Sequence, residues 1–520
     1  MTIGIVKDVT TPDYVKIQAK DPLPLGKYVS INREDDKCLG LVETSVASSS
    51  IIKDISNFDE AKESVEVSQD NSRDKGYETL IRVMGTIESL KSNKPKFPFT
   101  PTLPGTTVSS VDNSVLELIF SPDDSRFSSI GNLLRENDIN VKINLDEIFS
   151  RHLAILAMTG MGKSNFVAVL AREIGRIEGA CVIFDYHNDY GGLRLKDNNG
   201  KKIPINHIDA KIAPRVLTGE QFIQIIDLPK SAVHQADILI EVFEHVKTKE
   251  DFWGELIKAM EEIKNEPVDI VIAEPKGGMD VGDIKDRKKK AARLLTRIKR
   301  AKNLYANVID PRIEDPKSSL KQYAINVLNA TSFTEKQADI GLSYYLDTIF
   351  SDRKKAALGE KDVIFDNPLF FIIEEAHTFI KKEVESETKF ITAKIAKEAR
   401  KYALGLGIVS QRPSKVDEDI LSQMGSFAVL KMIQKRDQDS IFTTSEDITE
   451  EMTSQLSSLN VGEAFLSGRF VKVPTLVKID EISEEEKKFG KDISATKSFA
   501  RAKKMRTENS SQELIDKEDL

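Results

Sequence analysis

One segment of the sequence combines closely spaced glycines with a lysine and a serine, between an apolar stretch and a helical one. It reads HLAILAMTGMGKSNFVAVLARE and contains Gly160, Gly162, Lys163 and Ser164. Glycines let backbone N–H groups turn toward phosphates, and the N-terminus of the following helix adds partial positive charge. Lys163 would neutralise the β- and γ-phosphates, and the Ser164 hydroxyl would bind Mg²⁺. The segment therefore predicts a site for ATP and Mg²⁺.

The flanks of this loop strengthen the prediction. A chance Lys-Ser pair in a Gly-rich turn is the weaker alternative, because a predicted strand and a predicted helix border the loop directly. The loop departs from the general phosphate-loop pattern GxxxxGK(S/T) at one position, where Ala157 replaces the first glycine. The residues assigned to nucleotide binding here are Thr159, Gly160, Met161, Gly162, Lys163, Ser164 and Asn165.

Two adjacent acids end a second apolar stretch, LFFIIEEAH. A carboxylate buried without a partner costs several kcal/mol, so a metal or a basic group is implied. We expect Glu374 to hold Mg²⁺ through water and Glu375 to orient and deprotonate the attacking water. The alternative is a pair of acids that begins an exposed helix, and the phosphate loop makes it the weaker one.

A third segment, ESETKFITAKIAKEARKYALG, carries cations off its apolar stripe. At helical spacing Ile391 and Ile395 face the core, whereas Arg400 and Lys401 do not. A guanidinium aimed at the γ-phosphate of a neighbouring subunit raises the rate by roughly 10³ to 10⁵. On this segment alone, cations solvated near a helix C-terminus are the stronger reading. The next strand ends at Gln411, an amide placed to sense a γ-phosphate.

The elements that must position these residues alternate between apolar strands and helical stretches. We expect strands at 152–157, 180–186, 322–330, 369–375, 404–411 and 426–434, and a closing hairpin that turns at 467–469. This alternation predicts an α/β fold with a parallel sheet covered by helices. The long interval between the second and third strands is helical in pattern, so we expect an inserted helical subdomain at about 208–318.

The N-terminal part has a different texture, with short strands separated by turns. Strands starting at Tyr14, Leu25, Cys38 and Glu78 predict a small β-barrel over residues 1–94. Four prolines within ten residues predict a linker over 95–113. The expected ATPase domain spans 114–480. Residues 481–520 hold few large apolar side chains and predict a flexible tail.

The composition bounds the class of protein. The 520 residues include 40% hydrophobic and 30% charged residues, and no stretch reaches the roughly 18 apolar residues of a membrane span. With two cysteines and no signal-like start, a cytoplasmic protein is expected. The net charge of −8 argues against a protein that coats nucleic acid over its whole surface.

A basic run at 285–302 contrasts with this acidic balance. It contains ten Lys or Arg and one acid, a local charge of +9. If helical, it places Arg293, Arg297 and Arg300 on a face separate from its apolar stripe. A solvated helix and a surface for DNA phosphates are both open readings.

Several segments together resemble the archaeal HerA helicases, of the HerA-FtsK branch of RecA-like ATPases. They are RHLAILAMTGMGKSN, VIFDYHNDY, FIIEEAH, IAKEARKYALGLGIVSQRP, DEDILSQM and LSSLNVGEAFLSGRFVKVP. Alanine before the loop and a double acid are habits of that family. The resemblance implies a RecA-like P-loop ATPase core with an N-terminal small β-barrel and a helical insertion. It also implies a homohexamer that uses ATP to move along double-stranded DNA, with a NurA-type nuclease docked on the barrel side for resection of double-strand break ends.

The resemblance assigns further roles by motif. Arg400 corresponds to the arginine finger that acts in trans, Lys401 to its basic companion and Gln411 to the sensor amide. Arg151 matches an arginine that reaches a nucleotide phosphate, and Asp185 matches a nucleotide-site acid. The chain departs from the family at Asn188 and Asp189, which replace glycine and glutamate, and at Met161, where a small residue is usual. The region 468–472 is a candidate for adenine or ribose contact.

Three functions remain in competition at this stage. The first is an ATP-driven DNA translocase and helicase, which the tandem acids and the candidate arginine finger favour. The second is a nucleotide-gated assembly platform for a nuclease, without mechanical translocation. The third is a coupling-type ATPase that pumps DNA across membranes, which the lack of a membrane segment disfavours.

Overall fold

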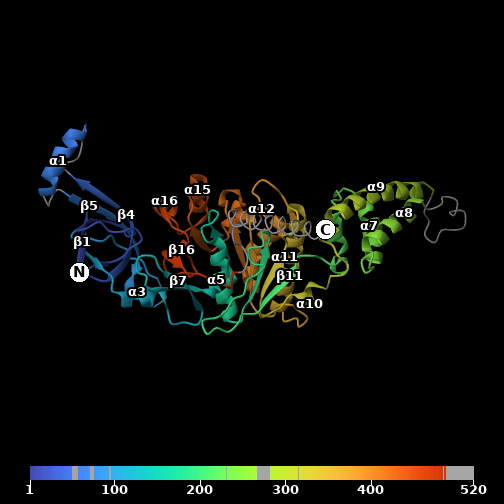
Figure 1. Cartoon of the computed structure of the whole chain (residues 1–520), viewed down its shortest axis with the longest axis horizontal. Coiled ribbons are helices and arrows are strands. Elements are labelled where there is room, and N and C mark those ends of the chain that lie inside the picture. Colours follow the sequence, from blue (N-terminus) through green and yellow to red (C-terminus); the bar gives the residue numbers. More distant parts are fainter. Residues whose placement is uncertain are drawn as a thin grey trace, which may run out of the picture.

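The computed structural model describes residues 1–49, 57–70, 75–92, 95–229, 231–265, 281–313, 315–483 and 485–487. The molecule is elongated, with a barrel at one end, a large sheet in the middle and a helical unit at the other end (Figure 1). The predicted α/β fold is confirmed. No helix in the described part of the chain has the length and apolar character that a membrane span requires.

The N-terminal unit is a closed six-stranded barrel in the order β1-β2-β5-β4-β3-β6. The predicted strands are present, and β1 and β6 are additional. β6 lies within 95–113, so the barrel extends past the predicted boundary at residue 94, because Val108 fills its core. Beyond the barrel, β4 and β5 continue as a ribbon that carries α1 at its tip (Figure 1). The elements are β1 (Thr2–Lys7), β2 (Tyr14–Ala19), β3 (Tyr28–Asn32), β4 (Lys37–Ser49), α1 (Phe58–Asp70), β5 (Lys75–Thr86), α2 (Ile87–Lys91) and β6 (Thr107–Ser110).

The central sheet has eleven strands in the order β11-β12-β10-β13-β14-β9-β15-β16-β17-β7-β8. The first part of this order, from β11 through β10 and β9 to β15, is parallel. The remaining strands, β16, β17, β7 and β8, pair with their neighbours in antiparallel fashion. All six predicted parallel strands are present, whereas β7, β8 and β11 were not predicted. The bounds are β7 (Phe127–Leu133), β8 (Asn140–Asn144), β9 (Leu153–Leu156), β10 (Ala180–Asp185), β11 (Ile205–Asp209), β12 (Ile325–Asn329), β13 (Leu369–Ile373), β14 (Leu404–Ser410), β15 (Ser426–Leu430), β16 (Glu463–Gly468) and β17 (Thr475–Ile479).

The predicted turn at 467–469 is wrong. The second arm begins only at Thr475, because Phe470 and Val471 are both buried in the core and the Phe470 carbonyl accepts a bond from the Asn144 N–H.

Helices cover the sheet and form the insertion. α6, α7 and α8 form an aromatic cluster from Phe222, Phe243, Phe252 and Trp253, and α9 packs against α7 and α8. The bounds are α3 (Asn113–Phe120), α4 (Leu145–Arg151), α5 (Lys163–Arg176), α6 (Gly219–Ile225), α7 (Val233–Val246), α8 (Phe252–Asn265), α9 (Val281–Tyr305), α10 (Pro316–Ser319), α11 (Glu335–Ala357), α12 (Ala376–Phe379), α13 (Glu387–Glu398), η3 (Ala399–Tyr402), α14 (Glu418–Leu421), α15 (Lys435–Thr444) and α16 (Glu450–Gln455).

The first residues of the predicted tail pack against the core. Ile482 is buried, and the Glu486 carbonyl accepts a bond from the Arg194 N–H at 3.0 Å. Residues 488–520, the greater part of that prediction, lie outside the described residues.

Candidate functional site

The predicted phosphate loop joins β9 to α5 at the carboxyl edge of the parallel sheet. Gly160 and Gly162 have φ angles of 78° and 102°, which side chains with a Cβ rarely adopt. α5 begins at Lys163, so its free N–H groups face the loop. The ends of β10, β13 and β14 lie at the same edge, because all these strands are parallel. Ligands bind at such edges in open α/β sheets.

Lys163 joins the loop to the two predicted acids. Its Nζ lies 3.0 Å from Glu374 Oε2 and 2.7 Å from Glu375 Oε1, and all three side chains are buried. Burial lowers the pKa of Lys163, but the two carboxylates outweigh burial and raise it above its ordinary value. Lys163 is therefore charged, and its N–H groups point at Glu374 and Glu375. A nucleotide phosphate would compete with these two carboxylates for Lys163.

Glu375 is constrained both by its backbone conformation and by contacts to its carboxylate oxygens. Its backbone is left-handed, with φ 48°, which is uncommon for a residue other than glycine, asparagine or aspartate. Gln411 Nε2 donates to Glu375 Oε1 at 2.6 Å, and the Thr159 hydroxyl donates to Gln411. His377 Nδ1 lies 3.2 Å from Glu375 Oε2. The predicted base and the predicted sensor amide are therefore in direct contact.

The pKa values of this pair follow from its surroundings. Burial raises the pKa of Glu375, but the charge of Lys163 and the hydrogen bond from the Gln411 amide lower it by more. The pKa of Glu375 is therefore below its ordinary value, and the carboxylate stays ionised. Burial lowers the pKa of His377 more than Glu375 raises it. Sequence reasoning gave His377 no role, although its place two residues after Glu375 was a signal.

Asp185, predicted at the nucleotide, has its carboxylate engaged with the backbone. Its oxygens accept bonds from the N–H groups of Asp189 at 3.0 Å and Tyr190 at 2.9 Å. Burial raises the pKa of Asp185 to about 6. The Tyr190 hydroxyl donates to Glu374, and Ser164 Oγ donates to Asp189 Oδ2 at 2.7 Å. Sequence reasoning missed Tyr190, which brings the end of β10 to the acids of β13.

The donor atoms at this edge suit Mg²⁺. Ser164, Glu374 and Asp189 present hydroxyl and carboxylate oxygens, which are the hard ligands that Mg²⁺ prefers. Within the described ranges, no group of three or more His, Cys, Asp or Glu side chains is arranged to hold a metal alone. Mg²⁺ at nucleotide sites is generally held by one or two protein groups together with substrate phosphates.

Two segments from the end of the chain lie against the phosphate loop. The Gly462 N–H donates to the Met161 carbonyl at 3.1 Å. Asn165 Nδ2 donates to the Asp480 carbonyl at 2.7 Å, and Asn165 Oδ1 accepts from the Ile482 N–H at 3.1 Å. The residues around 461 and 481 thus border the loop.

The predicted adenine contact at 468–472 lies elsewhere. Gly468 pairs with Ser426, at the beginning of β15, whereas Ala464 pairs with Leu430 at its end. Because β15 is parallel to β9, residues 468–472 lie at the edge opposite the phosphate loop of the same chain, which contradicts that contact within one subunit.

Arg151, Arg400 and Lys401 also lie at the opposite edge. Arg151 ends α4 just before β9, and Arg400 and Lys401 belong to η3 just before β14. Arg400 and Lys401 are exposed, as predicted, and Arg151 Nε lies 3.0 Å from Glu147 Oε2. The seven residues of β14 separate Arg400 from Gln411, about 20 Å at the rise of a strand. The structure therefore does not bring these cations to the phosphate loop of their own chain.

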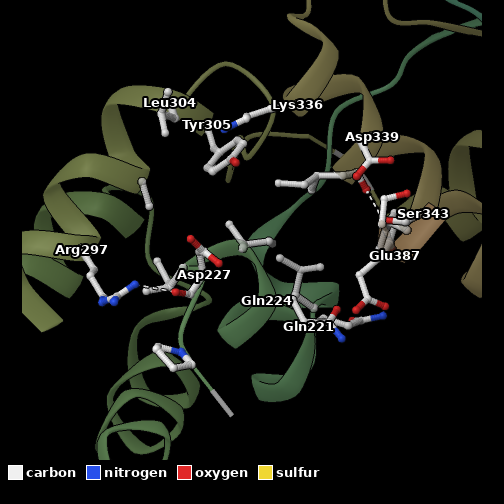
Figure 2. A pocket seen from close by; sticks show the side chains of 18 of the residues that line it. Gln221, Gln224, Asp227, Arg297, Leu304, Tyr305, Lys336, Asp339, Ser343 and Glu387 are labelled. Carbon is white, nitrogen blue, oxygen red and sulfur yellow. Dashed lines mark hydrogen bonds between the residues drawn. The ribbon is translucent and has the colours of Figure 1, made fainter. Parts of the chain in front are cut away.

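A cleft of about 1330 Å³ separates the insertion from the core (Figure 2). Arg293, Arg297 and Arg300 of α9 line it. Figure 2 shows Arg297 on the side of the insertion, and Asp339 of α11 and Glu387 of α13 on the side of the core. Among the described residues, the cleft shares none with the phosphate loop or its acids.

The matching family model and two relatives that cover most of the chain agree on one family. The family model described as Helicase HerA, central domain, matches residues 128–349. The DNA double-strand break repair helicase HerA of Saccharolobus solfataricus is 33% identical, over 92% of this chain and 92% of the relative. That of Sulfurisphaera tokodaii is 32% identical, over 97% of each chain. A solved structure of VirB4 of Thermoanaerobacter pseudethanolicus is 14% identical, covers 70% of this chain and 98% of its own, and has a TM-score of 0.47.

Proposed function

The chain belongs to the HerA helicase family and is an ATP hydrolase, and on this premise we propose that it is a DNA translocase and helicase in double-strand break repair. The observation that carries the proposal is the contact of Lys163 with Glu375 and of Glu375 with Gln411 at one sheet edge. A protein that only binds nucleotide needs no buried, ionised carboxylate beside the γ-phosphate position.

In this proposal each residue at the edge has a task during hydrolysis. Lys163 leaves the two carboxylates for the β- and γ-phosphates of ATP. Glu375, released from Lys163, orients a water molecule and accepts its proton. Gln411 links the γ-phosphate position to Glu375, which it already contacts. Mg²⁺, held by Ser164 and Glu374, would neutralise charge on the phosphates.

We propose that the working form is a homohexamer. Arg400 and Lys401 are exposed at the edge opposite the phosphate loop, so they act on nucleotide only when that edge faces the loop of a neighbouring subunit. Arg151 is placed for the same neighbour. Head-to-tail contacts of this kind close into a ring.

The proposed partners are double-stranded DNA and a NurA-type nuclease on the barrel side. The barrel lies at the end of the molecule away from the helical insertion (Figure 1), which gives a nuclease a separate surface from the ATPase core. The observation in favour of the nuclease is the family relationship, together with this separate placement.

ATPase rates with and without blunt duplex DNA test the proposal. We expect duplex DNA to raise the rate at least tenfold, because a translocase couples hydrolysis to movement. The Glu375→Gln variant, which keeps the Gln411 contact but removes the base, should lose this stimulation. Equal rates with and without DNA would favour the assembly platform, and wild-type hydrolysis by Glu375→Gln would remove Glu375 from the mechanism. The coupling-type DNA pump predicts stimulation as well, and differs in requiring a membrane partner for DNA transport.

A further inference from the structure

Ser164 and Asp189 form a contact that the predicted mechanism does not use. Ser164 Oγ donates its proton to Asp189 Oδ2 at 2.7 Å. A serine hydroxyl that gives its proton to a carboxylate leaves its oxygen lone pairs free for another partner. The metal-binding oxygen of the phosphate loop is thereby oriented before a metal binds.

Glu374 is not placed to accept that proton. Its Oε2 accepts from Lys163 at 3.0 Å, and its Oε1 accepts from the Tyr190 hydroxyl. When Lys163 turns to the phosphates, the Tyr190 bond still holds the Glu374 carboxylate on the β10 side. Asp189 is therefore the carboxylate that takes the Ser164 proton, within the part of the chain that the structure describes.

The position of Asp189 is fixed by buried groups. The Asp189 and Tyr190 N–H groups both donate to the Asp185 carboxylate, which is 1% exposed. Asn188, the residue before, has φ 64°, a left-handed conformation that turns the loop back toward β10. These bonds fix the backbone from which the Asp189 side chain extends, so less conformational freedom is lost when its carboxylate binds Ser164.

We propose that Asp189 is a positioning residue for the magnesium ion of the nucleotide, acting through the Ser164 hydroxyl. Asp189 orients the Ser164 oxygen toward the metal and adds a negative charge next to it. This inference rests on the proposed function, since it assumes that nucleotide and Mg²⁺ bind together at the phosphate loop. Partners that orient metal ligands in this way typically contribute about 10-fold to 100-fold in metal affinity.

Nucleotide binding with and without Mg²⁺ tests the inference. The dissociation constants of ADP and of a non-hydrolysable ATP analogue are measured by calorimetry, in excess Mg²⁺ and in EDTA. For the full-length wild type, Mg²⁺ should tighten binding. For Asp189→Ala, the increase in nucleotide affinity caused by Mg²⁺ should be smaller by about tenfold or more. The affinity measured in EDTA should stay within about twofold of the wild type. Asp189→Glu, which restores a carboxylate, should recover most of the gain.

The control is Glu178→Gln. Glu178 is exposed, pairs with Lys201 at 3.3 Å, and lies at the opposite end of β10, so its variant should bind both ligands as the wild type does. An unchanged gain from Mg²⁺ in Asp189→Ala overturns the inference. An equal change of the dissociation constant in Mg²⁺ and in EDTA also overturns the inference, because Asp189 would then only bind Ser164 in the nucleotide-free state. Absence of Mg²⁺-dependent binding in the wild type would instead contradict the proposed function.

Discussion

At the scale of single residues, His152 connects three elements in a strained conformation. Its backbone has φ 66° and ψ 163°, a region that is essentially reserved for glycine. The Leu406 N–H donates to Nδ1 at 2.9 Å, so Nε2 carries the proton and donates to the Ala396 carbonyl at 3.1 Å. These bonds tie the start of β9 to β14 and to the end of α13, just before Arg400.

Acid should destabilise the fold through His152. Burial lowers the pKa of His152 to about 4 from 6.5, so below pH 6.5 the unfolded state takes up a proton that the folded state does not. The free energy of unfolding therefore falls as the pH falls, by roughly 1.5 kcal/mol between pH 6.5 and pH 5. Above about pH 7.5 this contribution is constant.

Urea unfolding of the wild type and of His152→Gln at these two pH values checks this prediction. The variant lacks the titrating ring, so the difference in stability between the two proteins should narrow by the same amount as the pH falls. Parallel changes in both proteins would show that other groups dominate the acid response.

The sequence predicts those site residues that belong to one continuous motif. Lys163 and Ser164 are recognisable because loop, strand and helix follow one another in the chain. Tyr190 is not, because its bond to Glu374 spans 184 positions and depends on which strands are neighbours. Asp189 is likewise defined by its contact with Ser164 across two strand ends, which no local pattern encodes.

At the scale of elements, the same distinction separates predicted strands from missed ones. β13 and β15 are continuous apolar runs buried on both faces, which is the pattern of a central parallel strand. β8 and β11 lie at the two edges of the sheet and are only partly buried. Their mixed sequences, NVKIN and INHID, resemble loops until a neighbouring strand supplies the pairing.

The basic helix α9 gives a prediction at this scale. Its apolar stripe, from Ala291 to Ala301, is buried as expected, and Arg293 and Arg300 are exposed along the cleft. If they meet DNA phosphates, replacing both with Gln should reduce the slope of log affinity against log salt by about one per lost contact. Binding of duplex DNA between low and moderate salt measures this slope.

Lys299→Gln is the matched control for this measurement. Lys299 lies on the same helix but pairs with Glu261 at 2.9 Å, so its loss should leave the slope nearly unchanged. The acids on the core side of the cleft, including Asp339 and Glu387, would repel a DNA phosphate inside the cleft. Equal slopes for Arg293→Gln/Arg300→Gln and wild type would assign α9 to the solvated face of the insertion.

At the scale of the whole molecule, the placement of Arg400 predicts that subunits complement one another. Arg400→Ala and Lys163→Ala should each lose most ATPase activity, by roughly 10³-fold or more for the arginine. Mixing the two inactive proteins should restore activity, since roughly one interface in four of a randomly mixed ring joins an intact site to an intact arginine. Lys397→Ala, also exposed and near the end of α13, is the control and should remain active. No recovery on mixing would place Arg400 outside the neighbour's site.

The closed barrel limits how any partner can attach to it. Its six strands pair in a complete circle, so among the described residues the closed wall has no free backbone edge, and the extension of β4 past Leu41 pairs on one side alone. A partner therefore cannot extend this wall by adding a strand of its own, which is a common route for peptide recognition on open sheets. Recognition at the closed wall must therefore depend on the side chains that point outward, and surface substitutions alone can change the partner that this wall accepts.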